Sequence, residues 1–221
     1  MPGGASCLPD GDTARMGKLM RRNLAIFTLA LASPAWGGTI LFLGDSLTAG
    51  LGVPQEQAYP ALIQEKIRGK DLPFEVINAG VSGDTTAGGL ARLDWVLQKK
   101  IDLLVLALGA NDGLRGLPMT QTKANLQAII DRVKAKNPGA KIVIAGMQIP
   151  PNMGGEYGVA FRAVFADLAR ENGAALIPFL LEGVGGHDDL NQADQIHPTA
   201  AGHKVLAENV WRVLAPLLKK D

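Results

Sequence analysis

The sequence of 221 residues contains one cysteine, Cys7, and three histidines, His187, His197 and His203. A single cysteine cannot form a disulfide within the chain. Zinc and similar metals need several histidine or cysteine ligands, and here cysteine is too scarce and the histidines too scattered for a local cluster. The sequence therefore predicts no disulfide framework and no metal site.

An excess of charge of either sign is also absent. Lysine and arginine total 22 against 21 aspartate and glutamate, which gives a formal net charge of +1. Without a large single-sign field, electrostatics indicate neither a nucleic-acid partner nor an anionic surface. The length and the 47% hydrophobic content are typical of one well-cored globular domain.

Three common motifs are missing. The pair Gly50 and Gly52 lacks the third glycine of a dinucleotide fingerprint, because Gln55 occupies its place, and no phosphate-binding P-loop occurs. The Gly-x-Ser-x-Gly nucleophile elbow is absent as well, since Ser46 is followed by Leu47-Thr48, which weighs against an α/β-hydrolase fold. We expect no cofactor.

The N-terminus has the organisation of a Sec-type signal peptide. Basic residues follow Met16, an apolar run covers 24–32, and small residues precede a cleavage point after Ala35. The alternatives are a membrane anchor or a first core helix, but about nine apolar residues are too few for a bilayer, which needs roughly 20. We predict that residues 1–35 comprise an N-terminal extension and a signal peptide, and that Met16 is the true start. Cleavage sends a single domain, 36–221, to the periplasm or the medium, with no stable membrane anchor.

Apolar strand patterns alternate with helical spacings along the rest of the chain. Parallel strands buried on both faces read as continuous apolar runs, as 103–108 does. The predicted strands are 39–43, 74–78, 101–108, 141–145 and 175–178, and the predicted helices include 59–67, 90–97, 126–133, 161–168 and 206–217. This alternation predicts a three-layer α/β/α domain with a mainly parallel, five-stranded sheet.

Three polar, glycine-containing loops each follow a predicted strand: Gly44 to Gly50, Asn78 to Thr86, and Gly109 to Gly113. In parallel α/β sheets the site lies outside the carboxyl ends of the strands, so the three loops should converge. The first loop carries Ser46, which we expect to be exposed and to act as a nucleophile. A serine hydroxyl is weak at neutral pH and requires a base and donors for an oxyanion.

His197 is the preferred base. His187 lies in an irregular glycine-rich stretch typical of a solvated loop, and His203 lies on an apolar helix face where packing or capping is favoured. Asp194 precedes His197 by three residues in one turn, so its carboxylate can accept the Nδ1 proton and leave Nε2 for a serine. Asp-x-x-His alone is weak, because surface turns carry it as a plain hydrogen-bonded pair.

The combination of four ordered blocks is more specific. Gly44-Asp45-Ser46-Leu47, Ser82-Gly83-Asp84, Gly109-Ala110-Asn111-Asp112 and Asp194-Gln195-Ile196-His197 resemble the blocks of the GDSL esterases, the SGNH hydrolase superfamily. The resemblance spans roughly 39–218. Two further stretches, 109–117 and 147–152, are most similar to the bacterial periplasmic multifunctional acyl-CoA thioesterase/lysophospholipase/arylesterase group.

This resemblance implies an SGNH-hydrolase, flavodoxin-like architecture and a serine esterase. Ser46 would be the nucleophile, His197 the base and then the acid, and Asp194 its orienting partner. The oxyanion hole would be the backbone N–H of Ser46, the backbone N–H of Gly83 and the side-chain amide of Asn111. We expect Asp45 to brace the turn by hydrogen bonds to nearby backbone, because its side chain should point away from that of Ser46.

The expected substrates are small-molecule acyl esters or thioesters, including aryl esters, short to medium acyl chains and lysophospholipids. Candidate substrate contacts, which could instead anchor loops in the core, are Leu114, Leu117, Ile149 and Met153, with Arg115 for an anionic head group. Two alternatives remain open: a carbohydrate O-acetyl esterase or acyltransferase on the same fold, and a non-catalytic module that binds acylated ligands. The sequence leaves the oligomeric state open.

Overall fold

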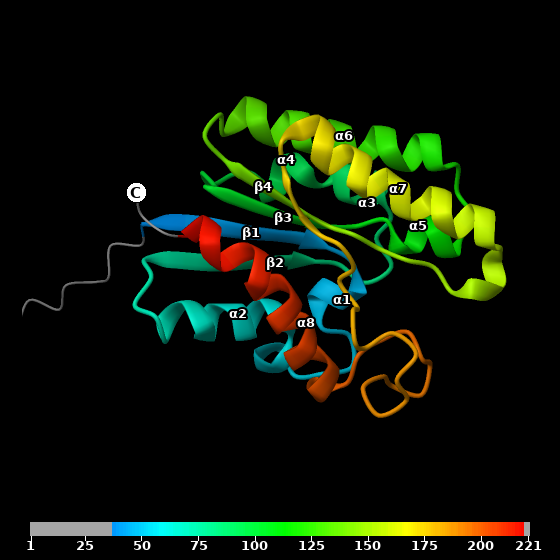
Figure 1. Cartoon of the computed structure of the whole chain (residues 1–221). Helices are drawn as coiled ribbons and strands as arrows, with labels where there is room; N and C mark the ends of the chain where they lie inside the picture. Colours follow the sequence, from blue (N-terminus) through cyan, green and yellow to red (C-terminus); the bar gives the residue numbers. More distant parts are fainter. Residues whose placement is uncertain (1–36, 219–221) are drawn as a thin grey trace, which may run out of the picture. The chain divides into compact units, whose positions relative to one another are not determined.

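A computed structural model describes residues 37–218, so the predicted signal peptide and N-terminal extension lie outside the described residues. Five parallel strands form one sheet in the order β2-β1-β3-β4-β5 (Figure 1). The strands are β1 Gly38–Gly44, β2 Phe74–Gly80, β3 Leu103–Ala107, β4 Lys141–Ala145 and β5 Ala175–Ile177. The predicted fold class is confirmed, and the sheet is wholly parallel rather than mainly so.

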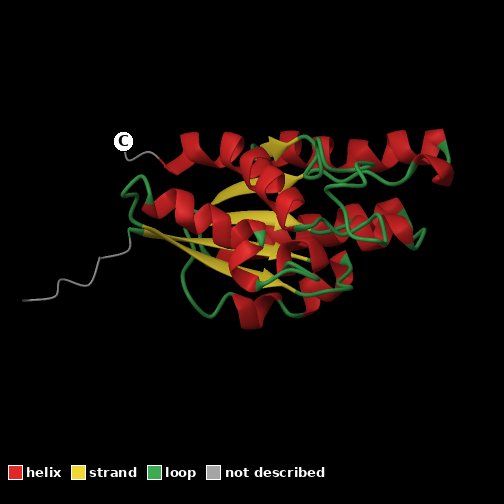
Figure 2. Cartoon of the chain, turned by 90° about the horizontal axis from the view of Figure 1, so that it is seen from below, coloured by secondary structure: helices red, strands yellow, loops and turns green. Residues whose placement is uncertain are grey.

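Helices cover both faces of this sheet. Figures 1 and 2 show α2 and α8 on one face, where they pack together, and α3, α4, α6 and α7 on the other. The helices are α1 Ser46–Ala49, α2 Tyr59–Arg68, α3 Thr86–Ala91, α4 Leu93–Val96, α5 Ala110–Leu114, α6 Met119–Lys136, α7 Gly155–Asn172 and α8 Ala200–Leu214, with short 3₁₀ turns η1 Gln55–Gln57, η2 Pro151–Met153 and η3 Ala215–Leu218. Within residues 37–218, no helix has the length and hydropathy to cross a membrane.

The strand order places the functional loops at one point of the sheet. From β1 the chain moves to one side to form β2, then crosses back to form β3 on the other side of β1. The direction of winding therefore reverses between β1 and β3, and ligands of doubly wound sheets bind outside the strand ends at such a reversal. The segments after β1 and β3 contain Ser46 and Asn111.

One predicted helix is wrong. The apolar spacing of 90–97 predicts a single helix, whereas the chain forms α3 and α4 with a break at Arg92, whose φ is −92° and ψ is 0°. Two glycines, Gly88 and Gly89, weaken α3, and the Arg92 side chain is held by contacts outside the helix. Two short helices, α1 and α5, also form where the sequence predicts only loops.

The core consists of the sheet and the inner faces of its helices. All five residues of β3 are buried, as expected of a central parallel strand. Between α8 and α2, the ring of His203 stacks on that of Tyr59 with centroids 6.3 Å apart, and both residues are fully buried. The Tyr59 backbone N–H donates to His203 Nδ1 at 3.3 Å, so the imidazole proton lies on Nε2, which has no partner among the described residues.

This buried histidine predicts a loss of stability in mild acid. Burial lowers the pKa of His203 to about 4, with a smaller contribution from the charge of His197. Between pH 4 and its ordinary value of 6.5, the unfolded chain binds a proton that the folded chain does not. The stabilisation is therefore complete above pH 6.5 and is lost as the pH falls, by up to about 2 kcal/mol at pH 5. Urea unfolding at pH 7.5 and pH 5 should show a larger loss in the wild type than in His203→Asn.

The comparison with His203→Asn isolates this histidine from Asp45, which titrates in the same window. Burial raises the pKa of Asp45 to about 6, so the folded chain binds that proton more readily and the effect on stability has the opposite sign. Asp45 is present in both proteins and cancels in the difference. An equal loss of unfolding free energy between pH 7.5 and pH 5 in the two proteins would contradict the prediction.

Candidate active site

Ser46 is the first residue of α1 and is separated from the end of β1 only by Asp45. Asp45 caps this short helix, because its Oδ1 accepts the Leu47 N–H at 3.0 Å. The expected bracing role of Asp45 is thus confirmed. The expectation of an exposed serine is wrong, since Ser46 is only 8% exposed: the chain turns into a helix here, and Ser46 is one of the buried residues of that helix.

Asp194 and His197 are brought together by a tight turn ahead of α8. Asp194 Oδ1 accepts the N–H groups of Ile196 and His197, both at 3.0 Å, and Oδ2 lies 2.7 Å from His197 Nδ1. The backbone N–H of His197, its ring and the Ile196 N–H together lower the pKa of Asp194 to about 2. The carboxylate is therefore ionised at neutral pH although its side chain is 46% exposed, and it holds the ring in one orientation.

The other ring nitrogen reaches the serine. His197 Nε2 lies 2.9 Å from Ser46 Oγ, within hydrogen-bonding distance, and joins residues 151 positions apart in the sequence. With Nδ1–H donating to Asp194, Nε2 is the acceptor for the serine hydroxyl. The three side chains form one continuous hydrogen-bonded chain, Asp194–His197–Ser46.

Gln192 ties this turn to the segment that follows Ser46. Its Nε2 donates to the Leu51 carbonyl at 2.7 Å and to the Pro198 carbonyl at 3.0 Å. Its backbone N–H also donates to the His197 carbonyl at 2.7 Å. One side chain therefore fixes the distance between the histidine turn and α1.

Two backbone N–H groups near the serine have no acceptor among residues 37–218. One belongs to Ser46, at the start of α1, where helical N–H groups lack intrahelical partners. The other belongs to Gly83, whose φ of +82° suits glycine, because a Cβ is disfavoured there. Free N–H groups of this kind are the usual donors to an oxyanion.

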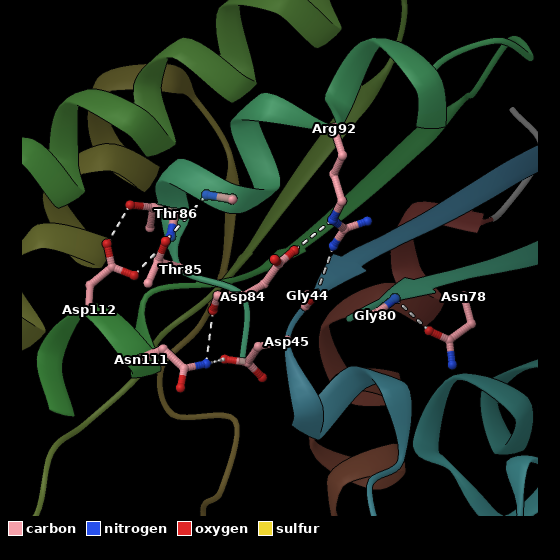
Figure 3. Close-up of polar contacts among 11 residues, drawn as sticks. Gly44, Asp45, Asn78, Gly80, Asp84, Thr85, Thr86, Arg92, Asn111 and Asp112 are labelled. Atoms are coloured by element: carbon pink, nitrogen blue, oxygen red, sulfur yellow. Dashed lines mark hydrogen bonds and ion pairs between the residues drawn. The ribbon is translucent and has the colours of Figure 1, made fainter. Parts of the chain in front are cut away.

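The Asn111 side chain lies between Asp45 and Asp84, the sequence neighbours of Ser46 and Gly83, as Figure 3 shows. Its Nδ2 donates to the Asp84 carbonyl at 2.8 Å and lies 3.5 Å from Asp45 Oδ2. The first contact fixes the orientation of the amide. The second is long, so this N–H is only weakly bound and is available to an incoming oxygen.

Asp112, next to Asn111, joins the second and third loops. Its carboxylate accepts from the backbone N–H and the hydroxyl of Thr86, and from the hydroxyl of Thr122 at 3.4 Å. Asp112 is 2% exposed, and Figure 3 shows its carboxylate facing Thr86. Sequence reasoning did not single out this residue for a role, because a contact 26 positions away leaves no local pattern.

The candidate substrate contacts divide into two groups. Leu114 is 37% exposed and Leu117 half-buried, whereas Ile149 is buried in the core and Met153 packs against it. Arg115 is exposed and donates from one guanidinium nitrogen to the Gly83 carbonyl at 3.0 Å. The structure therefore leaves Leu114 exposed and places Arg115 beside Gly83, whereas Ile149 belongs to the buried core.

Within residues 37–218, no group of three or more histidine, cysteine or acidic side chains is arranged to hold a metal ion. The described arrangement offers a hydrogen-bonded serine and histidine, a fixed carboxylate and N–H donors. These are the groups required for nucleophilic attack on a carbonyl carbon.

Comparisons with known proteins agree with this chemistry. Residues 42–205 match the model of the GDSL-like lipase/acylhydrolase family. The chain is 44% identical to esterase TesA of Pseudomonas aeruginosa over 189 residues, 85% of this chain and 93% of that protein. It is 38% identical to an arylesterase of Vibrio mimicus over 189 residues, again 85% of this chain and 93% of that protein. It is 39% identical to thioesterase 1/protease 1/lysophospholipase L1 of Escherichia coli K12, covering 83% of this chain and 86% of that protein.

Solved structures give the same result. The crystal structure of TesA superposes with a TM-score of 0.78 at 45% identity, covering 81% of this chain and 99% of the other. The esterase EstA from Pseudoalteromonas sp., solved as inhibited by monoethylphosphonate, superposes with a TM-score of 0.77 at 33% identity, covering 83% and 100%. The chain belongs to the GDSL-like lipase/acylhydrolase family and is an ester hydrolase.

Proposed function

We propose that this esterase works through a triad of Ser46, His197 and Asp194 and passes through an acyl-enzyme. One observation carries the proposal: the 2.9 Å contact of Ser46 Oγ with His197 Nε2, continued by the 2.7 Å contact of Nδ1 with Asp194. A base positioned on the serine by a second group is the arrangement that activates a weak nucleophile.

The proposed reaction has two halves. Ser46 Oγ attacks the acyl carbon while His197 Nε2 takes the hydroxyl proton, and Asp194 stabilises the resulting imidazolium. Collapse of the tetrahedral intermediate breaks the bond to the leaving oxygen or sulfur, which receives the proton from His197. Water, deprotonated by His197, then attacks the acyl-enzyme and releases the acid, with the proton returned to Ser46.

The proposed oxyanion hole has three donors: the N–H of Ser46, the N–H of Gly83 and the Asn111 amide. The two backbone groups have no acceptor among the described residues, and the amide has one weak contact to exchange. Their loops follow three different strands, so the hole depends on the sheet rather than on one local motif.

The proposed substrates are aryl esters, acyl thioesters and lysophospholipids with short to medium acyl chains. Support comes from the names of the relatives, which include an arylesterase and a thioesterase/lysophospholipase. Leu114 and Leu117 are proposed to contact the acyl chain, with Ile149 and Met153 supporting them from the core. Arg115 is proposed to meet an anionic head group, and its exposed position beside Gly83 supports this.

Labelling with a fluorophosphonate tests the proposal directly. The probe should attach to Ser46, in one copy per chain, and mass spectrometry of the digested protein locates it. The labelling rate should fall when a p-nitrophenyl ester or a lysophospholipid is present, because both would occupy the same serine. Labelling of another residue, or none in a protein that hydrolyses the ester, would refute the assigned nucleophile.

We also propose that residues 1–35 direct export and are removed, so that the working enzyme begins at Trp36 in the periplasm or the medium. The basic, apolar and small-residue segments after Met16 support this. The labelling experiment can use protein recovered from the periplasm. The intact mass of that protein then identifies its N-terminus. A mass that includes the apolar run 24–32 would contradict cleavage.

A further inference from the structure

Arg92 lies at the break between α3 and α4 and points toward the ends of the strands (Figure 3). Its Nε donates to Asp84 Oδ2 at 2.6 Å, and one terminal nitrogen donates to the Gly44 carbonyl at 3.1 Å. The two side chains are 20% and 16% exposed, which makes this the most enclosed ion pair among residues 37–218.

Both acceptors belong to segments that carry proposed oxyanion donors. Gly44 stands two residues before Ser46, and its carbonyl also accepts the Val81 N–H at 3.0 Å. Asp84 directly follows Gly83, and its carbonyl accepts Asn111 Nδ2 at 2.8 Å. One guanidinium therefore connects the segment before Ser46 with the residue that adjoins Gly83 and orients Asn111.

We propose that Arg92 is a positioning residue that sets the spacing of the three oxyanion donors. It touches neither the triad nor the expected position of the substrate, and it acts through Asp84 and Gly44. The proposal rests on the proposed oxyanion hole. A planar guanidinium suits the task because its nitrogens donate in fixed directions to two acceptors, which a lysine ammonium does not reproduce.

Loss of this contact should affect the chemical step more than substrate binding. Without the guanidinium, the enclosed Asp84 carboxylate has lost its cation and the loop around Gly83 is free to shift. A misplacement of about 1 Å from a distant change can cost about 10²-fold in rate. The oxyanion exists only near the transition state, so the loss should appear in kcat, with KM little changed.

The test compares Arg92→Met, Arg92→Lys and a matched control, Arg132→Met. Arg132 also pairs with an aspartate, Asp94, but at 3.4 Å on the exposed surface, and it lies on α6 away from the loops. With a p-nitrophenyl ester, Arg92→Met should lose about 10²-fold in kcat. Arg92→Lys should fall in between, and Arg132→Met should match the wild type. In a further variant, Arg92→Ala, a low, non-denaturing concentration of guanidinium should partly restore kcat.

Two results would overturn the proposal. One is an unchanged kcat in Arg92→Met, even if its thermal midpoint falls, since a purely structural role moves stability alone. The other is a change confined to KM. If Arg92→Met does not fold, the test uses Arg92→Lys, assayed below its own thermal midpoint. A wild-type kcat in Arg92→Lys would refute a need for two directed contacts. Asn111→Ala, assayed in parallel, separates the proposed oxyanion hole from the proposed role of Arg92. A fully active Asn111→Ala would refute the oxyanion hole. If Asn111→Ala is impaired and the Arg92 variants are not, only the role of Arg92 is refuted.

Discussion

Alanine in place of Ser46 is expected to lower kcat for an aryl ester by about 10⁶-fold, to a level set by the remaining oxyanion donors and substrate binding. The reason is geometric. Ser46 Oγ is the atom that meets His197 Nε2 at 2.9 Å, and within residues 37–218 the only other serine is Ser82. Among the described residues, no other hydroxyl is hydrogen-bonded to the His197 ring.

His197→Ala should cost about as much as Ser46→Ala, and the double variant little more, because residues of a triad act as a unit. The measurement is single-turnover and steady-state hydrolysis of a p-nitrophenyl ester. Ser82→Ala is the matched control: Ser82 is exposed and has no side-chain hydrogen bond among the described residues, so its variant should keep wild-type turnover. Undiminished hydrolysis by Ser46→Ala would refute the assignment of Ser46 as the nucleophile. Strictly additive losses of kcat in the Ser46→Ala, His197→Ala and double variants would refute the triad.

The strands and long helices were predictable because their signals are local. β3 is an unbroken apolar run, and the apolar spacing of 126–133 and 161–168 lies inside α6 and α7. The short helices α1 and α5 were not predictable. Their apolar residues are too few to show a period, and only α1 has a side-chain cap, Asp45, whereas α5 has none.

The Asp194 and His197 pair was predictable for the same local reason, since three residues of sequence assemble it. Its contact with Ser46 could only be inferred from the family resemblance, because 151 residues separate the two. The residues that connect the loops left no signal at all. Arg92 pairs with Asp84 across α3, a helix that contains two glycines, and Asp112 reaches Thr86 from α5, so neither spacing fits a known motif.

These missed residues share a physical role. The proposed oxyanion donors come from loops after β1, β2 and β3, and each loop is short and glycine-containing. Such loops need side chains that join them, and Asp84, Arg92 and Asp112 supply buried or enclosed contacts between neighbouring loops. We therefore expect accurate placement of the proposed donors to depend on this second set of residues, which act through the loops.

Alanine in place of Asn111 is expected to lower kcat by about 10²- to 10³-fold with little change in KM. Asn111 Nδ2 is held by the Asp84 carbonyl at 2.8 Å and has its second, weaker contact with Asp45 at 3.5 Å. In the ground state the amide gains little from a neutral carbonyl oxygen, whereas in the transition state it meets an oxyanion. The substitution should therefore slow the chemical step and leave substrate binding nearly unchanged.

Two further variants separate this catalytic effect from a structural one. Asn111→Asp keeps the size of the side chain but places a carboxylate where negative charge develops, so it should be slower than Asn111→Ala. Asn172→Ala is the matched control, since Asn172 donates to Gln127 at 2.7 Å and to the Leu168 carbonyl at 3.0 Å at the far end of α7. It should lower the thermal midpoint and leave kcat unchanged. If Asn111→Ala instead raised KM at constant kcat, Asn111 would bind substrate and transition state equally, and the oxyanion would have to be held by the two backbone N–H groups alone.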